Sequence, residues 1–259
     1  PMPAPPGLHL IDNATVHAAP GAQPRVMDVL IRDGRIERVA ERIEPGAARV
    51  WNAEGMHLYA GFIDAYVPVA TAAPNDGGPG THWSSLVTPQ RDALAGPGLP
   101  ASDAAELRKL GFTAAHASPD AGIFRGWSAV VSTAEPFADP APGRPPLYPA
   151  RAAQHLGFQR AGWSGDGYPT SHMGVVALMR QTFLDAAHRA SAEHPDASAL
   201  DAIDPAALMV YDTGSELEAM LADKVAREFA HERVALVGSG NEFKRLAALA
   251  QAGRPVVVP

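Results

Sequence analysis

The sequence predicts an α/β protein in which an all-β opening is followed by strands that alternate with helices. Three observations support this class. Two β-rich runs, residues 26–32 and 35–39, flank Asp33-Gly34, and an Asp-Gly pair in that setting strongly favours a two-residue hairpin turn. The hydrophobic period changes after about residue 60. From residue 208 onward, short apolar runs alternate with amphipathic segments at lengths typical of parallel βαβ units.

Length and composition fit one large domain, or a domain with a small module. The chain has 259 residues, 46% hydrophobic and 19% charged, which is typical of a soluble globular protein. No apolar run approaches the roughly 20 residues of a membrane span. The net charge of −7 does not favour binding to nucleic acid or to an anionic membrane. We therefore expect a soluble protein with neither kind of partner. Its compartment stays open, cytoplasmic or exported after removal of a signal. The lack of cysteine excludes disulfides and zinc–thiolate sites.

The first half of the chain is predicted to be rich in strands. Residues 1–7 are expected to form an extended, proline-rich terminus, and residues 8–60 a set of short strands. The elements predicted after the hairpin are a strand at 56–59, a helix at 102–110, strands at 112–117 and 129–132, and loops at 134–169. Serine and aspartate residues begin the predicted helix, and Gly111 ends it.

In the second half of the chain, helices and strands are predicted to alternate. Ser171 opens a helix whose apolar stripe is expected to pack in the core, namely Met173, Val176, Ala177, Phe183, Leu184 and Ala187. The elements predicted next are strands at 208–211, 234–237 and 255–258 and helices at 215–231 and 241–252. Thr213-x-x-Glu216 is a capping-box pattern, and Gly253 closes the last helix. Such spacing suits a barrel or an open doubly wound sheet, and the pattern alone does not separate them.

Two short motifs resemble a known family. Residues 31–36, Ile-Arg-Asp-Gly-Arg-Ile, and residues 61–65, Gly-Phe-Ile-Asp-Ala, together resemble the N-terminal signature of the amidohydrolase superfamily, closest to its imidazolonepropionase-like branch. Segments 111–115 and 122–129 are similar to later strands of that branch. The resemblance implies a small β-sandwich segment at residues 8–60, followed at residues 61–259 by a partial TIM-like (β/α) barrel with strands one to about six. An open doubly wound sheet that binds a small molecule or a nucleotide is the alternative.

The family's metal-binding residues are missing. In the family the first strand ends Asp-Ala-His-x-His, and the two histidines bind a catalytic divalent metal such as zinc. Here the run is Asp64-Ala65-Tyr66-Val67-Pro68, and Asn241 stands where the branch often carries another histidine. Proline has no donor atom, and a phenol is a poor zinc ligand at neutral pH. We expect this chain to bind no metal, although the resemblance implies metal-dependent hydrolysis of non-peptide C–N bonds of the cyclic amide type.

A few other residues are candidates for a site. His116 ends a predicted strand, and Asp64 matches a family position, but a structural hydrogen-bonding role is the usual one for each. Tyr211 and Asp212 end the fourth-strand candidate, where no lysine is available to carbamylate, and His172 lies near a helix start. His82 is a weaker candidate. The histidines form no His-x-His or i, i+4 pair from which a metal cluster can be assembled.

Two loop segments are candidates for a phosphate-binding loop and a nucleophile elbow. Gly238-Ser239-Gly240 lies between a strand and a helix, as a phosphate-cradling loop does. The third glycine of a dinucleotide fingerprint would fall at Phe243, so we interpret the segment as a tight turn capped by Asn241. Ser164 does not fit a nucleophile-elbow pattern.

Two functional hypotheses remain from the sequence. The chain is either a degenerate, non-catalytic amidohydrolase-like unit that scaffolds an active partner, or one section of a working hydrolase whose metal ligands lie elsewhere. About six barrel strands and a short sandwich also predict that a second chain or a C-terminal continuation completes the fold. The alternative is that residues 134–169 contain two further strands, which would make the barrel more complete. A small-molecule substrate remains open.

Overall fold

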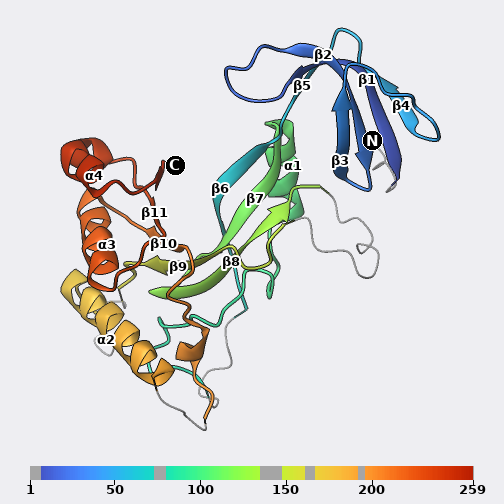
Figure 1. Ribbon diagram of the computed structural model, residues 1–259. Helices are drawn as coiled ribbons and strands as arrows, with labels where there is room; N and C mark the ends of the chain where they lie inside the picture. Colours follow the sequence, from blue (N-terminus) through green and yellow to red (C-terminus); the bar gives the residue numbers. More distant parts are fainter. Residues whose placement is uncertain (1–6, 73–79, 135–147, 161–166, 192–195, 259) are drawn as a thin grey trace. The chain divides into compact units, whose positions relative to one another are not determined.

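The computed structural model describes residues 7–72, 80–134, 148–160, 167–191 and 196–258. The chain divides into two compact units, Pro1–Phe62 and Ile63–Pro259 (Figure 1). The smaller unit carries a five-stranded sheet, and the larger unit is built on a seven-stranded sheet.

The smaller unit is one mixed sheet. Its strands are β1 (Leu8–His17), β2 (Arg25–Arg32), β3 (Arg35–Ala40), β4 (Arg49–Asn52) and β5 (His57–Tyr59). The order is β3-β2-β1-β4, and β5 also pairs with β1. The predicted hairpin is confirmed: β2 and β3 are antiparallel, and Asp33 and Gly34 both have positive φ, 47° and 78°, as a type I′ turn requires. The described part of the expected sandwich is therefore a single layer.

A buried carboxylate helps to hold this sheet together. Asp28 lies in β2 and is 4% exposed. Its Oδ1 accepts the backbone N–H of Asn13 at 2.9 Å, and its Oδ2 accepts that of Ile43 at 2.8 Å. Asn13 has φ 62° and sits where the register of β1 shifts. The carboxylate thus satisfies backbone groups at a strand bulge and in a loop, which offsets the cost of burying its charge.

The larger unit holds seven strands and, among the residues described, four α-helices. The strands are β6 (Phe62–Val69), β7 (Phe112–Pro119), β8 (Phe124–Ser132), β9 (Ala153–Gly157), β10 (Met209–Asp212), β11 (Val234–Val237) and β12 (Val256–Val257). The helices are α1 (Ala101–Lys109), α2 (His172–Ala190), α3 (Glu216–Glu228) and α4 (Leu246–Ala252), with 3-10 turns η1 (Ala199–Ala202) and η2 (Glu242–Arg245). The sheet order is β12-β11-β10-β9-β8-β7-β6.

The prediction of a partial (β/α) barrel is wrong. A (β/α) barrel consists of parallel strands joined by helices, whereas β8 is antiparallel to both β7 and β9. Only residues 120–123 connect β7 to β8. A parallel connection needs a crossover of about a dozen residues or more, so this short link forces the two strands to run in opposite directions. The larger unit is accordingly a strand-rich mixed sheet with few helices.

The predicted βαβ alternation is confirmed in the second half of the chain. Strands β9 to β12 are parallel to one another, with α2, α3 and α4 between them. All three helices pack on the strand face that carries Leu156, Tyr211 and Leu236 (Figure 1). The opposite face holds a separate cluster that includes Val210 and Val237. A doubly wound sheet would have helices on both faces, so the described packing argues against that alternative.

Several predicted elements need correction. Strand β9 lies inside residues 134–169, where only loops were expected; the rest of that segment falls partly outside the described residues. Helix α1 begins after Pro100, not at its Ser and Asp residues. Helix α2 begins after Ser171 as predicted, and Val176 and Phe183 are buried. Met173 and Leu184, at 85% and 56% exposed, are not in the core.

The last two helices also differ in detail. Ser215, not Thr213, caps α3, and its side chain accepts the Glu218 backbone N–H. The helix predicted at 241–252 is divided into η2 and α4, and Gly253 closes it with φ 67° as expected. Asn241 makes no side-chain cap bond. No helix among the described residues has the length and apolar character of a membrane span.

Candidate functional site

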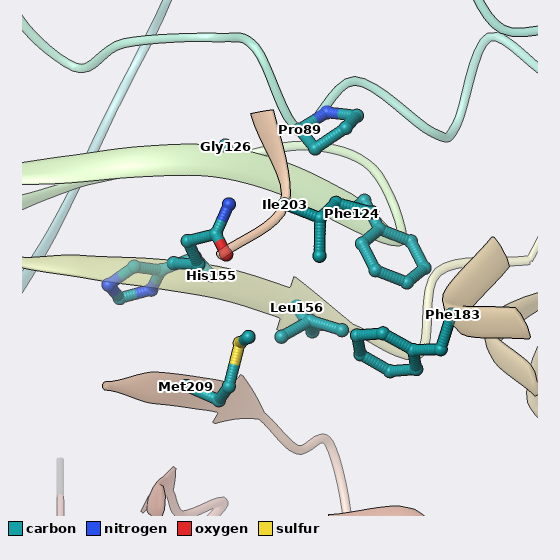
Figure 2. Close-up of a pocket in the computed structure, with 9 residues that line it drawn as sticks. Pro89, Phe124, Gly126, His155, Leu156, Phe183, Ile203 and Met209 are labelled. Atoms are coloured by element: carbon teal, nitrogen blue, oxygen red, sulfur yellow. The ribbon is translucent and has the colours of Figure 1, made fainter. Parts of the chain in front are cut away.

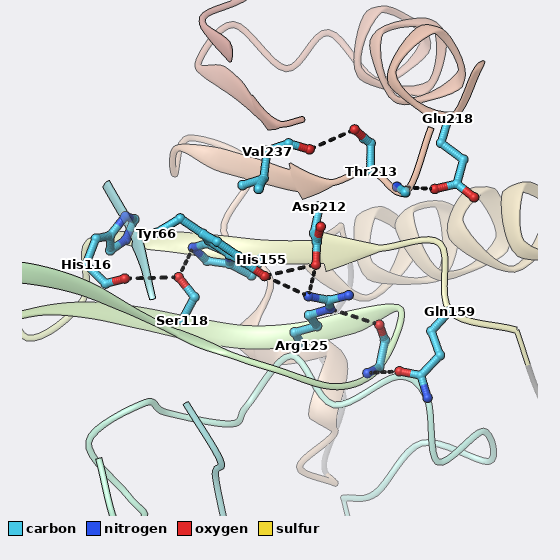
Figure 3. A network of polar contacts seen from close by, with 12 residues as sticks. Tyr66, His116, Ser118, Arg125, His155, Gln159, Asp212, Thr213, Glu218 and Val237 are labelled. Carbon is cyan, nitrogen blue, oxygen red and sulfur yellow. Dashed lines mark hydrogen bonds and ion pairs between the residues drawn. The ribbon is translucent and has the colours of Figure 1, made fainter. Parts of the chain in front are cut away.

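A polar network lies at the strand face opposite the helices (Figure 3). It joins Tyr66 of β6, Arg125 of β8 and Asp212 at the end of β10. Asp212 Oδ2 accepts the Tyr66 hydroxyl at 2.9 Å and Arg125 Nη1 at 2.6 Å. Arg125 Nη1 also lies 3.3 Å from the Tyr66 hydroxyl oxygen. One carboxylate oxygen therefore receives two donors from strands that are 87 and 146 residues away from it in sequence.

A strand irregularity aims Arg125 into this network. The pairing of β8 with β9 shifts register between Phe124 and Gly126, which leaves Arg125 as the extra residue of a bulge. Gly126 has φ 104°, a conformation that side chains rarely adopt. On the facing strand, a Cβ on Gly157 would overlap the Arg125 guanidinium, so glycine makes room for it. Arg125 Nε donates to the Gly122 carbonyl at 3.2 Å.

The ion pair between Arg125 and Asp212 is largely buried. The Arg125 side chain is 8% exposed and the Asp212 side chain 28%. A buried ion pair of this kind is tolerated when further hydrogen bonds satisfy both partners. Removing one partner strongly destabilises the protein, because the other charge is then buried without compensation. Burial, followed by the nearby Asp212 carboxylate, raises the pKa of Tyr66 to about 12 against the opposing effect of Arg125. Tyr66 is therefore a neutral hydrogen-bond donor at neutral pH.

Two histidines lie beside the network on β7 and β9. His116 Nδ1 is 3.1 Å from the Ala65 carbonyl, which only accepts, so this nitrogen carries a proton. His116 Nε2 is 2.6 Å from Ser128 Oγ. Burial lowers the pKa of His116 below its usual value. His116 is therefore a neutral ring with both nitrogens engaged inside the protein.

His155 is the more deeply buried of the two. Its Nε2 lies 3.3 Å from Ser118 Oγ, and its Nδ1 has no hydrogen-bond partner among the described residues. The His116 and His155 rings meet edge to face with centroids 5.3 Å apart. Burial, with smaller effects from His116 and Arg125, holds the pKa of His155 well below its ordinary value. This ring is a neutral core residue.

The residues at the family's metal positions do not fit a divalent metal. Tyr66 keeps its proton and donates a hydrogen bond to Asp212, and Pro68 has no side-chain atom that can bind a metal. The Arg125 guanidinium already binds the Asp212 carboxylate, and its positive charge opposes a second cation there. Asn241 is half-buried beside a turn, where its backbone N–H donates to Ser239 Oγ. In the described ranges no group of three or more His, Cys, Asp or Glu side chains is placed to hold a metal ion.

The other predicted site residues lie apart from the network. Asp64 Oδ1 accepts the Tyr66 backbone N–H at 3.1 Å, a local contact within β6 that does not involve the Tyr66 hydroxyl. Tyr211 is fully buried on the helix-covered face, so it points away from Asp212. His172 Nε2 is 2.6 Å from Glu218 Oε1 on α3. His82 Nδ1 accepts the Ser84 backbone N–H at 3.1 Å.

A carboxylate of the chain itself fills the candidate phosphate loop. Glu242 Oε1 accepts the Ser239 backbone N–H at 2.6 Å and the Ser239 hydroxyl at 3.0 Å. Burial would raise the pKa of Glu242, but these bonds from Ser239 and backbone N–H groups of the turn lower it below its usual value. The amides that would bind a phosphate are thus occupied. Ser164 lies outside the described residues.

A cavity lies on the helix-covered side of β8, β9 and β10 (Figure 2). It is lined by Pro89, Phe124, Gly126, Gln154, His155, Leu156, Phe183, Ile203 and Met209. Its volume of about 10 Å³ is room for roughly one water molecule. Ligand pockets span about 300–1,000 Å³, so this cavity is a packing defect and not a substrate site.

One of the comparisons with known proteins bears on the fold. No protein-family model matches the chain, and no curated protein matches it. An amidohydrolase from Thermotoga maritima MSB8 is similar in structure, with a TM-score of 0.68 and 19% identity over 96% of this chain and 69% of that chain. The chain shares the fold of this amidohydrolase. A prolidase complexed with N-methylphosphonate-L-proline aligns with a TM-score of 0.41 and 11% identity, over 96% of this chain and 77% of that chain.

Arg125 is the residue of this network that sequence reasoning missed. Tyr66 and Asp212 were both singled out, but nothing in the pattern linked them. One signal was present: residues 123–127 form an apolar run, Ile-Phe-Arg-Gly-Trp, interrupted by a single charge. A charged residue in a buried strand requires a partner, and Asp212 at the end of another strand is the one that the fold supplies.

Proposed function

We propose that this chain is an amidohydrolase-like unit of the imidazolonepropionase-like branch that does not hydrolyse a substrate by itself. Its role is to support a catalytic partner or an adjoining domain. The observation that carries the proposal is the ion pair of Arg125 with Asp212, joined by the Tyr66 hydroxyl. The pair lies where the resemblance leads one to expect metal ligands, next to the position held by Tyr66.

The chemistry of these side chains favours a structural role. Metal-dependent hydrolysis needs a bound water with a lowered pKa, which then attacks a polarised carbonyl. A guanidinium stays protonated, so Arg125 can accept no proton from water. Tyr66, whose pKa is raised to about 12, cannot act as a base at neutral pH. Asp212 Oδ2 already accepts hydrogen bonds from two donors, Tyr66 and Arg125. The set stabilises the junction of three strands, and neither Arg125 nor Tyr66 can serve as a general base there.

We also propose that further polypeptide, from a second chain or a continuation of this one, pairs with the ends of the seven-stranded sheet. Strands β6 and β12 are the two ends of the sheet, and among the strands that the structure describes each of them pairs with one neighbour only. The similar amidohydrolase extends beyond the match, since 69% of its chain is covered. The second hypothesis is that a complete hydrolase takes its metal ligands from this further polypeptide. It therefore requires the same added polypeptide. Any small-molecule substrate then belongs to the assembled protein.

Metal analysis and an activity assay test the proposal together. The purified chain is dialysed against Zn²⁺, then against buffer, and analysed for retained zinc and for hydrolysis of a cyclic amide. The same is done with Asp212→Asn and with Tyr66→Phe, the milder change. We expect the wild type and Asp212→Asn to retain the same amount of zinc. We also expect the wild type to hydrolyse the cyclic amide no faster than Asp212→Asn does. One zinc per chain that is lost in a folded Asp212→Asn variant, together with hydrolysis, would overturn the proposal.

A further inference from the structure

Two histidines of the smaller unit hold ring nitrogens against each other. His17 is the last residue of β1, and His57 is the first residue of β5. The two strands pair in parallel, with Thr15 beside His57 and His17 beside Tyr59. Because alternate residues of a strand point to the same face, the side chains of all four lie on one face of the sheet. His17 Nε2 lies 2.8 Å from His57 Nδ1 at an exposed position.

An aromatic contact restrains one of the two rings. The His17 ring stacks on Tyr59 with centroids 4.1 Å apart and an interplanar angle of 17°. The same pairing of β1 with β5 places His57 next to His17 as well, with ring centroids 5.2 Å apart. The backbone pairing and the stacking therefore bring the two nitrogens together without a ligand, and little side-chain freedom remains to be lost on binding.

The contact also brings two metal-binding atoms together. In a neutral pair, one imidazole nitrogen carries the shared proton and the other accepts it. A metal ion that replaces this proton binds both nitrogens, since neutral imidazole is a ligand through either ring nitrogen. Each ring has to turn so that its lone pair, which points along the N···N line in the hydrogen bond, points instead at an ion to one side of that line; the exposed position of the pair leaves room for this turn.

We propose that His17 and His57 form a site for a divalent transition metal of the Cu²⁺ or Ni²⁺ type, with water completing the coordination. With metal–nitrogen bonds of about 2.05 Å, the observed separation of 2.8 Å corresponds to an N–metal–N angle of about 86°. This is close to the roughly 90° of square-planar or tetragonal Cu²⁺ and Ni²⁺. Tetrahedral zinc, with an angle of about 109°, needs nitrogens roughly 3.3 Å apart.

Another histidine of the same sheet provides a matched control. His9 also lies in β1, but its Nδ1 accepts the Trp51 indole N–H at 3.3 Å, so its ring neighbour is not a second imidazole. If the metal bound to any surface histidine, substitution of His9, His17 or His57 would weaken its binding equally. A two-nitrogen site responds only to the last two.

The test is a titration of the full chain, purified without a histidine tag, with Cu²⁺ alone at pH 7.5. Calorimetry gives the affinity, and electron paramagnetic resonance reports how many nitrogens are bound. The wild type is expected to bind one Cu²⁺ through two imidazole nitrogens. His17→Gln and His57→Gln should each weaken binding by about tenfold or more, because a second ligand held on the same scaffold binds intramolecularly. His9→Gln should bind like the wild type.

Further measurements separate the outcomes. The wild type should bind Cu²⁺ and Ni²⁺ more tightly than Zn²⁺, and acidification should release the metal because protons compete for the nitrogens. Circular dichroism checks that each variant keeps its sheet. A single-nitrogen spectrum in the wild type, or equal Cu²⁺ affinity in folded His17→Gln, His57→Gln and His9→Gln, would overturn the proposal.

Discussion

Tyr66 and Tyr211 of the larger unit differ in what their hydroxyl groups contact. The Tyr66 hydroxyl donates to Asp212, whereas the fully buried Tyr211 hydroxyl has no partner among the residues described. An unpaired buried hydroxyl costs about 1–3 kcal/mol, and a hydrogen bond to a charged group is worth about as much. We expect Tyr211→Phe to leave the free energy of unfolding unchanged or raise it by up to about 1 kcal/mol. Tyr66→Phe should lower it by about 1–2 kcal/mol.

Urea unfolding of the two variants measures both effects, and each serves as the control for the other because the chemical change is identical. A larger loss of stability in Tyr211→Phe than in Tyr66→Phe would contradict the assignment of both hydroxyls. The comparison also bears on the site, since it asks whether the Tyr66 contact with Asp212 stabilises the protein.

His155 makes the stability of the larger unit depend on pH. Burial holds its pKa well below the ordinary value of 6.5, so the folded chain binds this proton less readily than the unfolded chain. For a group whose folded pKa is depressed in this way, stability is full above the unfolded pKa and falls as the pH drops below it. Each unit below about 6.5 costs up to about 1.4 kcal/mol for one such proton.

We expect His155→Phe to unfold with a shallower dependence on pH between about 6.5 and 5. Urea unfolding at several pH values measures the slope. His82, His116 and His231 also have pKa values lowered by burial, so a residual slope is expected in the variant. Equal slopes in His155→Phe and the wild type would count against a buried neutral ring.

Helix α3 shows how tertiary contacts override a local motif. The sequence pattern Thr213-x-x-Glu216 predicts a capping box, but the Thr213 hydroxyl donates to the Val237 carbonyl at 2.7 Å. Ser215 takes over as the cap, with its Oγ 3.2 Å from the Glu218 backbone nitrogen. We expect Ser215→Ala to lower the free energy of unfolding by about 1 kcal/mol, and Glu216→Gln to have a smaller effect. Thermal and urea unfolding measure both. A larger loss with Glu216→Gln would favour the capping box instead.

Elements fixed by local chemistry were predictable, whereas strand direction was not. The hairpin follows from Asp33-Gly34, since the turn needs positive φ at both positions. Strand β9 was missed because its sequence, Ala-Gln-His-Leu-Gly, has neither alternation nor β-branched residues, although all five residues are buried. The antiparallel course of β8 depends on the four-residue link at 120–123, which a search for βαβ units overlooks. The barrel was predicted from the resemblance to the amidohydrolase superfamily, and this short link contradicts the all-parallel course that a barrel requires.

At the scale of the whole molecule, the motifs at residues 31–36 and 61–65 indicated an amidohydrolase-like fold, and the similarity to a solved amidohydrolase supports it at that level. The site was only partly predictable. Tyr66 and Asp212 were named from strand ends, but their contact joins residues 146 positions apart and passes beside Arg125. Contacts at such separation arise from sheet order, which one sequence does not encode in any local pattern.

The open ends of the seven-stranded sheet lead to the last prediction, which concerns assembly. Strand β12 is short, it pairs with β11 on one side, and the neighbouring Val258 is 68% exposed. Exposed apolar side chains next to an unpaired strand edge favour association with other polypeptide. We expect the isolated chain to self-associate, or to bind the polypeptide that completes the sheet.

Size-exclusion chromatography with light scattering measures that association as a function of concentration. Val258→Lys should weaken it, because a charge at a sheet edge opposes pairing with another strand. Leu184→Lys is the matched control, since Leu184 is 56% exposed on helix α2, which connects β9 and β10 in the interior of the sheet order. If the wild-type chain is a monodisperse monomer that unfolds cooperatively at all concentrations, the sheet needs no added strand, and the partner proposed here has no physical basis.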